Sequence, residues 1–135
     1  MTTKARPDDV RLGVPAIDAE HEAQLKLLDA LEAAAASGDR ERTRDRLATF
    51  VTYLDAHFLS EQLLMRGHAY PGYAAHVQDH EAAIGMMNEL RERIDAGEDE
   101  LQPPVLDALR RWLIGHVTTV DRDFAEFLKE RGKAR

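Results

Sequence analysis

Polar side chains recur on the apolar face of each of four predicted helices, and this pattern constrains the fold more than any other sequence feature. Apolar residues in each segment follow the three-and-four spacing of a helix face that packs into a core. A histidine falls on that face in every segment, and in the second segment Glu61 falls there as well. A fold that buries these four faces must therefore also bury several imidazoles and a carboxylate.

Glycine and proline mark the ends of the four segments. Gly38 and Gly67 follow periodic apolar stretches, where helices commonly end, and Asp39 can cap the second helix. Pro71 suits the first turn of the third helix. Short connections between long helices favour an all-α fold, an antiparallel up-down-up-down four-helix bundle. We expect a single domain over residues 1–135, with an arm over 1–16 and helices over about 18–36, 40–66, 71–96 and 103–129.

Composition excludes several classes of function. The 135 residues include 25 Asp and Glu against 18 Lys and Arg, and the net charge of -7 disfavours a nucleic-acid or anionic-membrane partner. No apolar run reaches the roughly 20 residues of a membrane span. The stretch from Met1 to Pro7 leads into no apolar segment, so we expect no secretory signal and a cytoplasmic protein. The absence of Cys excludes disulfides and thiolate metal sites, which leaves histidines and carboxylates to carry the chemistry.

The buried carboxylate favours a metal site. A single histidine on an apolar face is more often a hydrogen-bonded core residue than a ligand. Burial of an ionised Glu61, however, costs several kcal/mol unless a cation neutralises it. No Lys or Arg falls on the predicted core faces. A metal cation is therefore the simplest partner for these polar residues.

Helical spacing directs the candidate ligands toward one another. Residues four apart differ by only about 40° in direction, which aligns His57 with Glu61 and His76 with His80. The full candidate set holds five imidazoles and two carboxylates. Seven ligands exceed the four that satisfy one zinc ion, and they suit two ions that share carboxylates. Imidazole and carboxylate without sulfur favour iron over manganese or zinc. The candidate ligands are His21, His57, Glu61, His76, His80, His116 and Asp121.

His116 and Asp121 require a local change in the helix. They are five residues apart, and in a regular helix their directions diverge by about 140°. The β-branched run Val117 to Val120 between them also fits poorly in regular helix. We predict a π-type turn that returns Asp121 to the face of His116, since such turns cluster at functional sites.

The spacing of these residues resembles the hemerythrin family, in its bacterial single-domain form, from about residue 12 to residue 128. The series is His21, His57-x-x-x-Glu61, His76-x-x-x-His80 and His116-x-x-x-x-Asp121, with Trp112-Leu113 before the last histidine. The resemblance implies two iron ions (Fe²⁺/Fe³⁺) joined by an oxo or hydroxo bridge. It assigns His76, His80 and His116 to one iron, His21 and His57 to the other, and Glu61 and Asp121 to both. The second iron would keep an open position for a ligand.

By this resemblance the function is reversible binding of dioxygen for transport, storage or delivery, without enzymatic activity. Water must be kept from such a site, and Leu113 is the first candidate for its apolar wall, with Ile17 and Leu25 as further candidates. The alternatives are a di-iron redox enzyme acting on peroxide or nitric oxide, or an oxygen or redox sensor acting through a separate partner. A metal-free bundle is disfavoured by Glu61. An oxygen-consuming enzyme is a possible partner that the sequence does not identify.

Several residues depart from the family pattern or lie outside it. Many relatives carry Trp near the position of Arg6 and Glu at the position of Gln62. Because Gln62 follows Glu61 directly, it should turn away from the metals and affect them little. Asp18 lies three residues before His21, where it could orient that imidazole or simply favour the helix N-terminus. His68 lies on no predicted core face, and we expect it at the surface.

Overall fold

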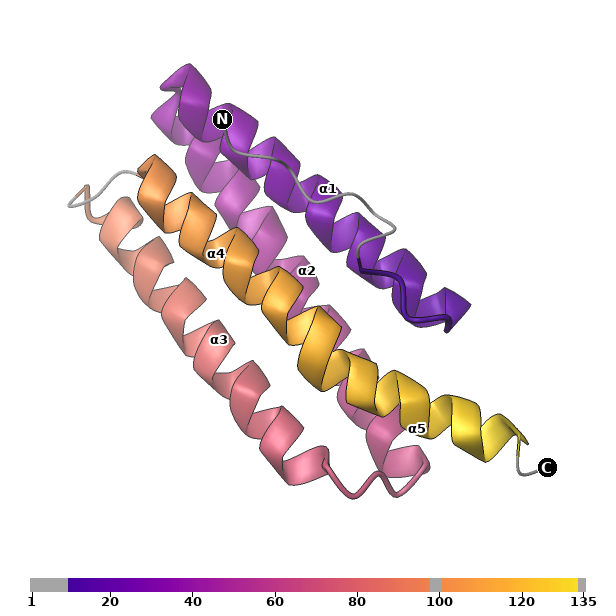
Figure 1. Cartoon of the computed structure of the whole chain (residues 1–135). Helices are drawn as coiled ribbons and strands as arrows, with labels where there is room; N and C mark the ends of the chain where they lie inside the picture. The colour runs from indigo at the N-terminus through magenta and orange to yellow at the C-terminus, as the bar shows by residue number, and fades with distance from the viewer. Residues whose placement is uncertain (1–9, 98–100, 134–135) are drawn as a thin grey trace.

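Four long helical rods pack side by side in antiparallel order, as Figure 1 shows, which confirms the expected four-helix bundle. The computed structural model describes residues 10–97 and 101–133, and within these ranges it contains no strand. The fourth rod is continuous but consists of three helical segments. In chain order the elements are α1 (Pro15–Ser37), α2 (Arg40–Gly67), α3 (Tyr73–Asp95), α4 (Pro103–His116), the π-helix η2 (Val117–Asp121) and α5 (Arg122–Lys133).

The connection between α1 and α2 follows the sequence prediction. Gly38 ends α1 in the left-handed conformation with φ 79°, which glycine adopts without steric cost. The Asp39 carboxylate accepts a hydrogen bond from the Arg42 backbone N–H at 3.0 Å and so caps α2. The start of α1 differs, since the helix begins at Pro15 and takes in the last two residues of the expected arm. Residues 1–9 of that arm, with Arg6, lie outside the described residues.

The turn between α2 and α3 corrects the expectation for Pro71. That residue lies in the turn, and α3 begins at Tyr73 after Gly72. The Tyr73 backbone N–H donates to the Tyr70 carbonyl at 3.2 Å, which closes a turn over the Pro71–Gly72 pair. The Tyr70 ring packs against the Gly72 backbone, so that a Cβ at residue 72 would lie 2.8 Å from it. The chain must therefore complete this turn before the helix can begin.

The π-helix predicted from the spacing of His116 and Asp121 is confirmed at Val117–Asp121. A π-turn holds one more residue than an α-turn. Two threonine hydroxyls of this segment donate to carbonyls of the preceding turn: Thr118 Oγ1 to the Ile114 carbonyl at 2.8 Å, and Thr119 Oγ1 to the Gly115 carbonyl at 2.6 Å. The hydroxyl groups of the β-branched run therefore tie the π-helix to the end of α4.

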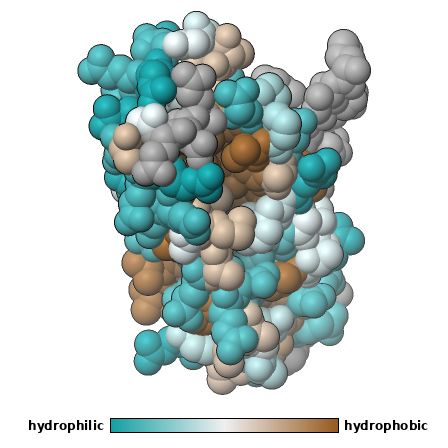
Figure 2. All heavy atoms as spheres, turned by 90° about the vertical axis from the view of Figure 1, so that its left-hand side faces the viewer, coloured by the Kyte–Doolittle hydropathy of each residue, from teal (hydrophilic) through white to brown (hydrophobic). Residues whose placement is uncertain are grey.

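Apolar side chains fill the space between the rods along the bundle. Leu28, Leu31 and Leu54 are fully buried, and Phe124 closes the core from α5. At the surface, Figure 2 shows separate apolar patches within a largely hydrophilic face. Among the described residues, no helix combines the length and apolar character that crossing a membrane requires.

Candidate metal centre

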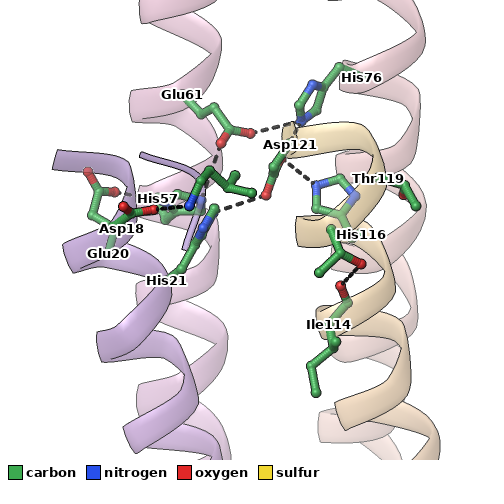
Figure 3. A network of polar contacts seen from close by, with 12 residues as sticks. Asp18, Glu20, His21, His57, Glu61, His76, Ile114, His116, Thr119 and Asp121 are labelled. Atoms are coloured by element: carbon green, nitrogen blue, oxygen red, sulfur yellow. Dashed lines mark hydrogen bonds and ion pairs between the residues drawn. The ribbon is translucent and has the colours of Figure 1, made fainter. Parts of the chain in front are cut away.

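The structure brings all seven candidate ligands together in the bundle core, from all four rods. Figure 3 shows most of them pointing toward a common space, namely His21, His57, Glu61, His76, His116 and Asp121. The side chains form two groups, and within each group the potential ligand atoms lie within 4.8 Å of one another. Every member is buried. One group comprises His76, His80, His116, Glu61 and Asp121, and the other comprises His21, His57, Glu61 and Asp121.

The two carboxylates lie between the two sets of imidazoles. His76 Nε2 is 2.8 Å from both Glu61 Oε1 and Asp121 Oδ1. On the other side, Asp121 Oδ2 is 3.0 Å from His21 Nε2 and Glu61 Oε2 is 3.6 Å from His57 Nε2. Each carboxylate thus directs one oxygen to each group. A carboxylate placed in this way can bridge two cations.

Many of these polar atoms face one another without hydrogen bonds. Both oxygens of Glu61 and the Nε2 atoms of His80 and His116 are buried and unsatisfied, although His80 Nε2 is only 3.1 Å from Glu61 Oε1. Two atoms bound at right angles to one ion, each at roughly 2.1 Å, are about 3 Å apart. The spacing and the unsatisfied atoms together fit a site for cations better than a hydrogen-bonded network.

Charges within the cluster oppose the effect of burial on its pKa values. Burial raises the pKa of Asp121, but the adjacent imidazoles of His116, His21 and His76 outweigh it and hold that pKa well below its usual range. Burial lowers the pKa of His76, whereas its hydrogen bond to Asp121 and the adjacent carboxylate of Glu61 raise it to about 9. Without a metal, the cluster therefore holds a proton on His76 at neutral pH. A bound cation would replace that proton.

Three polar side chains outside the set of candidate ligands contact the outer nitrogens of the imidazoles. His57 Nδ1 is 2.6 Å from Glu20 Oε1, and His116 Nδ1 is 3.1 Å from Asp79 Oδ2. Such contacts fix the orientation and tautomer of a ligating histidine. Glu20 and Asp79 each precede a candidate ligand in the chain, but each contacts an imidazole on the next helix. The spacing of residues within one helix therefore could not predict these contacts.

The third contact is made by Gln62. Its side chain is half-buried, and its Nε2 atom lies 3.1 Å from His80 Nδ1. The residue does turn away from the core face of α2, as its position after Glu61 requires. Its side chain therefore reaches the outer side of the His80 imidazole on α3. Gln62 therefore touches the candidate metal centre although it does not face it.

The first role considered for Asp18, orientation of the His21 imidazole, does not agree with the contacts of its side chain. Its carboxylate accepts hydrogen bonds from the backbone N–H groups of Leu12 at 2.7 Å and Gly13 at 3.1 Å. It therefore fixes the chain segment that leads into α1 rather than orienting His21. His68 forms the C-cap of α2 and belongs to neither group of candidate ligands.

Aromatic and apolar side chains enclose the cluster. The Phe58 ring stacks on His80 with centroids 3.8 Å apart, and the Trp112 ring stacks on His116 at 4.9 Å. The three proposed wall residues are all buried: Leu113, Ile17 and Leu25. A surface hollow of about 460 Å³ lies beside the second group, where it is lined by Ala16, Ile17, Glu20, His57, Ser60, Glu61, Leu63 and Leu64.

Comparison with known proteins supports the same interpretation of the site. Residues 12–128 match the family model of the hemerythrin HHE cation binding domain. The chain is 34% identical to a bacteriohemerythrin of Stenotrophomonas maltophilia over 90% of its length and 79% of the relative's. It is 30% identical to a bacteriohemerythrin of Methylococcus capsulatus, covering 78% and 80%. A crystal structure of wild-type hemerythrin superposes with a TM-score of 0.86 at 25% identity, over 93% of this chain and 97% of the other.

Proposed function

The chain belongs to the hemerythrin family, and on that basis we propose that it binds dioxygen reversibly at a di-iron centre and does so as a binding protein, not an enzyme. One observation carries the proposal. Two carboxylates, Glu61 and Asp121, are shared by a group of three imidazoles and a group of two. This asymmetry leaves the second ion with fewer protein ligands and thus with room for a small molecule.

The seven side chains would hold the two ions in distinct roles. His76, His80 and His116 would bind one ion, and His21 and His57 the other. Glu61 and Asp121 would bridge both, with an oxo or hydroxo group completing the bridge. When bound, the iron pair supplies the two electrons that dioxygen accepts reversibly. The protein's task is then to hold the ions, to neutralise their charge with carboxylates and to keep water away.

The surroundings of the second group suit a small neutral ligand. Four of the eight residues that line the hollow beside His57 and Glu61 are apolar, among them Ile17 and Leu64. Leu113 is 2% exposed and precedes His116 by one helical turn. Apolar walls such as Ile17 and Leu113 would limit the access of outside proton donors, which favours release of dioxygen over irreversible oxidation.

The visible spectrum of iron-loaded protein, cycled between argon and air, tests this function. We expect a charge-transfer band that appears in air and disappears under argon through repeated cycles. A single irreversible change to a ferric spectrum would overturn reversible binding and favour a redox enzyme acting on peroxide or nitric oxide.

A variant of the apolar wall extends the test. Leu113→Asn introduces a polar side chain that can admit water, and we expect oxidation to the ferric state to be faster by about tenfold or more while the iron content is unchanged. Leu47→Asn, a matched substitution of a buried leucine in α2, controls for general loosening of the core. Equal oxidation rates in wild type and Leu113→Asn would remove Leu113 from the pocket wall.

A further inference from the structure

The outer contacts of the imidazoles follow a regular order around the bundle. Each contact is made by a residue next to a candidate ligand in the chain, and each reaches an imidazole on the following helix. Glu20, before His21 on α1, contacts His57 on α2. Asp79, before His80 on α3, contacts His116 on the fourth rod. Between these two lies Gln62, which follows Glu61 on α2 and contacts His80 on α3.

The three partners differ in charge. Glu20 and Asp79 are carboxylates, and each supports an imidazole of a different metal group. Gln62 carries a neutral amide and supports a second imidazole of the group that contains His116. A carboxylate partner makes a ligating imidazole more basic, whereas an amide orients the ring with less transfer of charge. His80 is thus held in place without the added basicity that a carboxylate gives.

The chemistry of His80 determines which amide atom must face it. Its Nε2 atom points to Glu61 at 3.1 Å and is the atom available to a metal. When Nε2 binds a metal as a neutral imidazole, Nδ1 carries the proton and requires an acceptor. The Gln62 Nε2 atom faces His80 Nδ1 in the structure. A half-turn of the amide would put Oε1 in its place and meet this need.

We propose that Gln62 is a positioning residue for His80, which fixes the imidazole for metal binding and, being neutral, keeps the reduction potential of that iron higher than a carboxylate would. The proposal rests on the proposed di-iron centre. It predicts two separable effects of substitution. Loss of the hydrogen bond weakens metal retention, and addition of a negative charge at the same atom lowers the potential.

Two substitutions at Gln62 separate these effects. Gln62→Met keeps the length of the side chain but removes the hydrogen bond, and we expect Co²⁺ to leave the protein about tenfold faster under a chelator. Gln62→Glu keeps an acceptor and adds charge, and we expect metal retention close to wild type with a lower midpoint potential of the iron-loaded protein. Gln78→Met and Gln78→Glu provide matched controls, since Gln78 is exposed on α3.

The outcomes decide the proposal independently of dioxygen binding. Release of Co²⁺ and the midpoint potential are measured without dioxygen, so an iron site that oxidises irreversibly would overturn the proposed function and leave this test intact. If Gln62→Met released Co²⁺ at the same rate as the wild type, the positioning role would be overturned. A shift of potential in Gln78→Glu equal to that in Gln62→Glu would show a general charge effect and overturn the tuning role. Circular dichroism of each variant confirms that the bundle is folded.

Discussion

Two clusters of charged residues, each with a buried charged group at its centre, join α1 to the fourth rod, and they differ in how their charges are balanced. In one, the Arg110 guanidinium donates hydrogen bonds to both oxygens of Glu32, at 3.0 and 2.8 Å, and a further one to Asp29. Only its Nη1 atom has no hydrogen bond. In the other, Glu61 and Asp121 lie among imidazoles, and both oxygens of Glu61 are unsatisfied. The first cluster contains its own cation, and the second has the composition of a site that takes its cations from solution.

The two clusters differ in how far their carboxylates are exposed to solvent. Arg110 is 5% exposed, but its carboxylate partners reach the surface, Asp29 more than Glu32. The charge of Arg110 is thus paired within the cluster, and the remaining carboxylate charge is exposed to solvent. Glu61 and Asp121 have side chains only 1% exposed, so their charge must be balanced inside the protein. Substitutions in each cluster should therefore affect different properties.

Glu61→Ala should give the largest effect. It removes a carboxylate that both metal groups share, and we expect affinity for iron to fall at least about 100-fold. The iron-loaded wild type should unfold at a clearly higher temperature than the variant, because metal that binds only the folded state stabilises it. Iron content after desalting and calorimetry check both expectations. Retention of two iron ions per chain by the variant would show that Glu61 is not a bridging ligand.

Arg110→Met should destabilise the fold while leaving the metal centre unchanged. The substitution leaves the partly exposed carboxylates of Glu32 and Asp29 without their cationic partner. We therefore expect a loss of about 2 kcal/mol in the free energy of unfolding. Denaturant titration of the metal-free protein measures this loss. The double variant Arg110→Met with Glu32→Leu should recover part of it. A fall in iron affinity would contradict the separation of the two clusters.

The pH dependence of the metal-free protein distinguishes the clusters further. The pKa of His76 is raised to about 9 in the folded state, against about 6.5 when unfolded. The folded protein binds more protons across this window, so the stabilising contribution of His76 is complete below about pH 6.5 and is lost as the pH rises through about 9.

Melting temperatures of the metal-free protein should therefore fall between pH 7 and pH 9.5. His76→Gln should flatten this profile, because it removes the group that titrates. Arg110 should contribute equally across the window, since Glu32 and Asp29 outweigh the effect of burial and raise its pKa above an already high value. A wild-type profile that does not change with pH would contradict the raised pKa of His76.

Thr118→Val should have the smallest effect and tests the π-helix that brings Asp121 into the centre. The substitution removes the hydroxyl that donates to the Ile114 carbonyl, at an expected cost of about 1 kcal/mol. Thr49→Val is the matched control, since Thr49 makes the same type of bond to the Asp45 carbonyl within regular helix. Equal costs at the two positions would show that the π-helix does not depend on the hydroxyl.

Local geometry allowed much of this protein to be predicted from its sequence. The periodicity of apolar residues predicted four rods, and the capping residues Gly38 and Asp39 predicted where two of them meet. The five-residue interval between His116 and Asp121 predicted the π-helix. Each of these features depends on backbone hydrogen bonds within a few residues, so the sequence contains all the information they need. The same spacing selected the seven side chains that the structure brings together.

Contacts between helices depended on the tertiary structure. Glu20, Asp79 and Gln62 lie off the core faces of their own helices, and their partners are 37, 37 and 18 residues away along the chain. The buried Arg110 finds Glu32 at a separation of 78 residues. Such contacts depend on how each helix is rotated about its axis and how far it is shifted along its neighbour. The packing of the whole core sets this rotation and this shift, and neither can be deduced from the spacing of residues within a single helix.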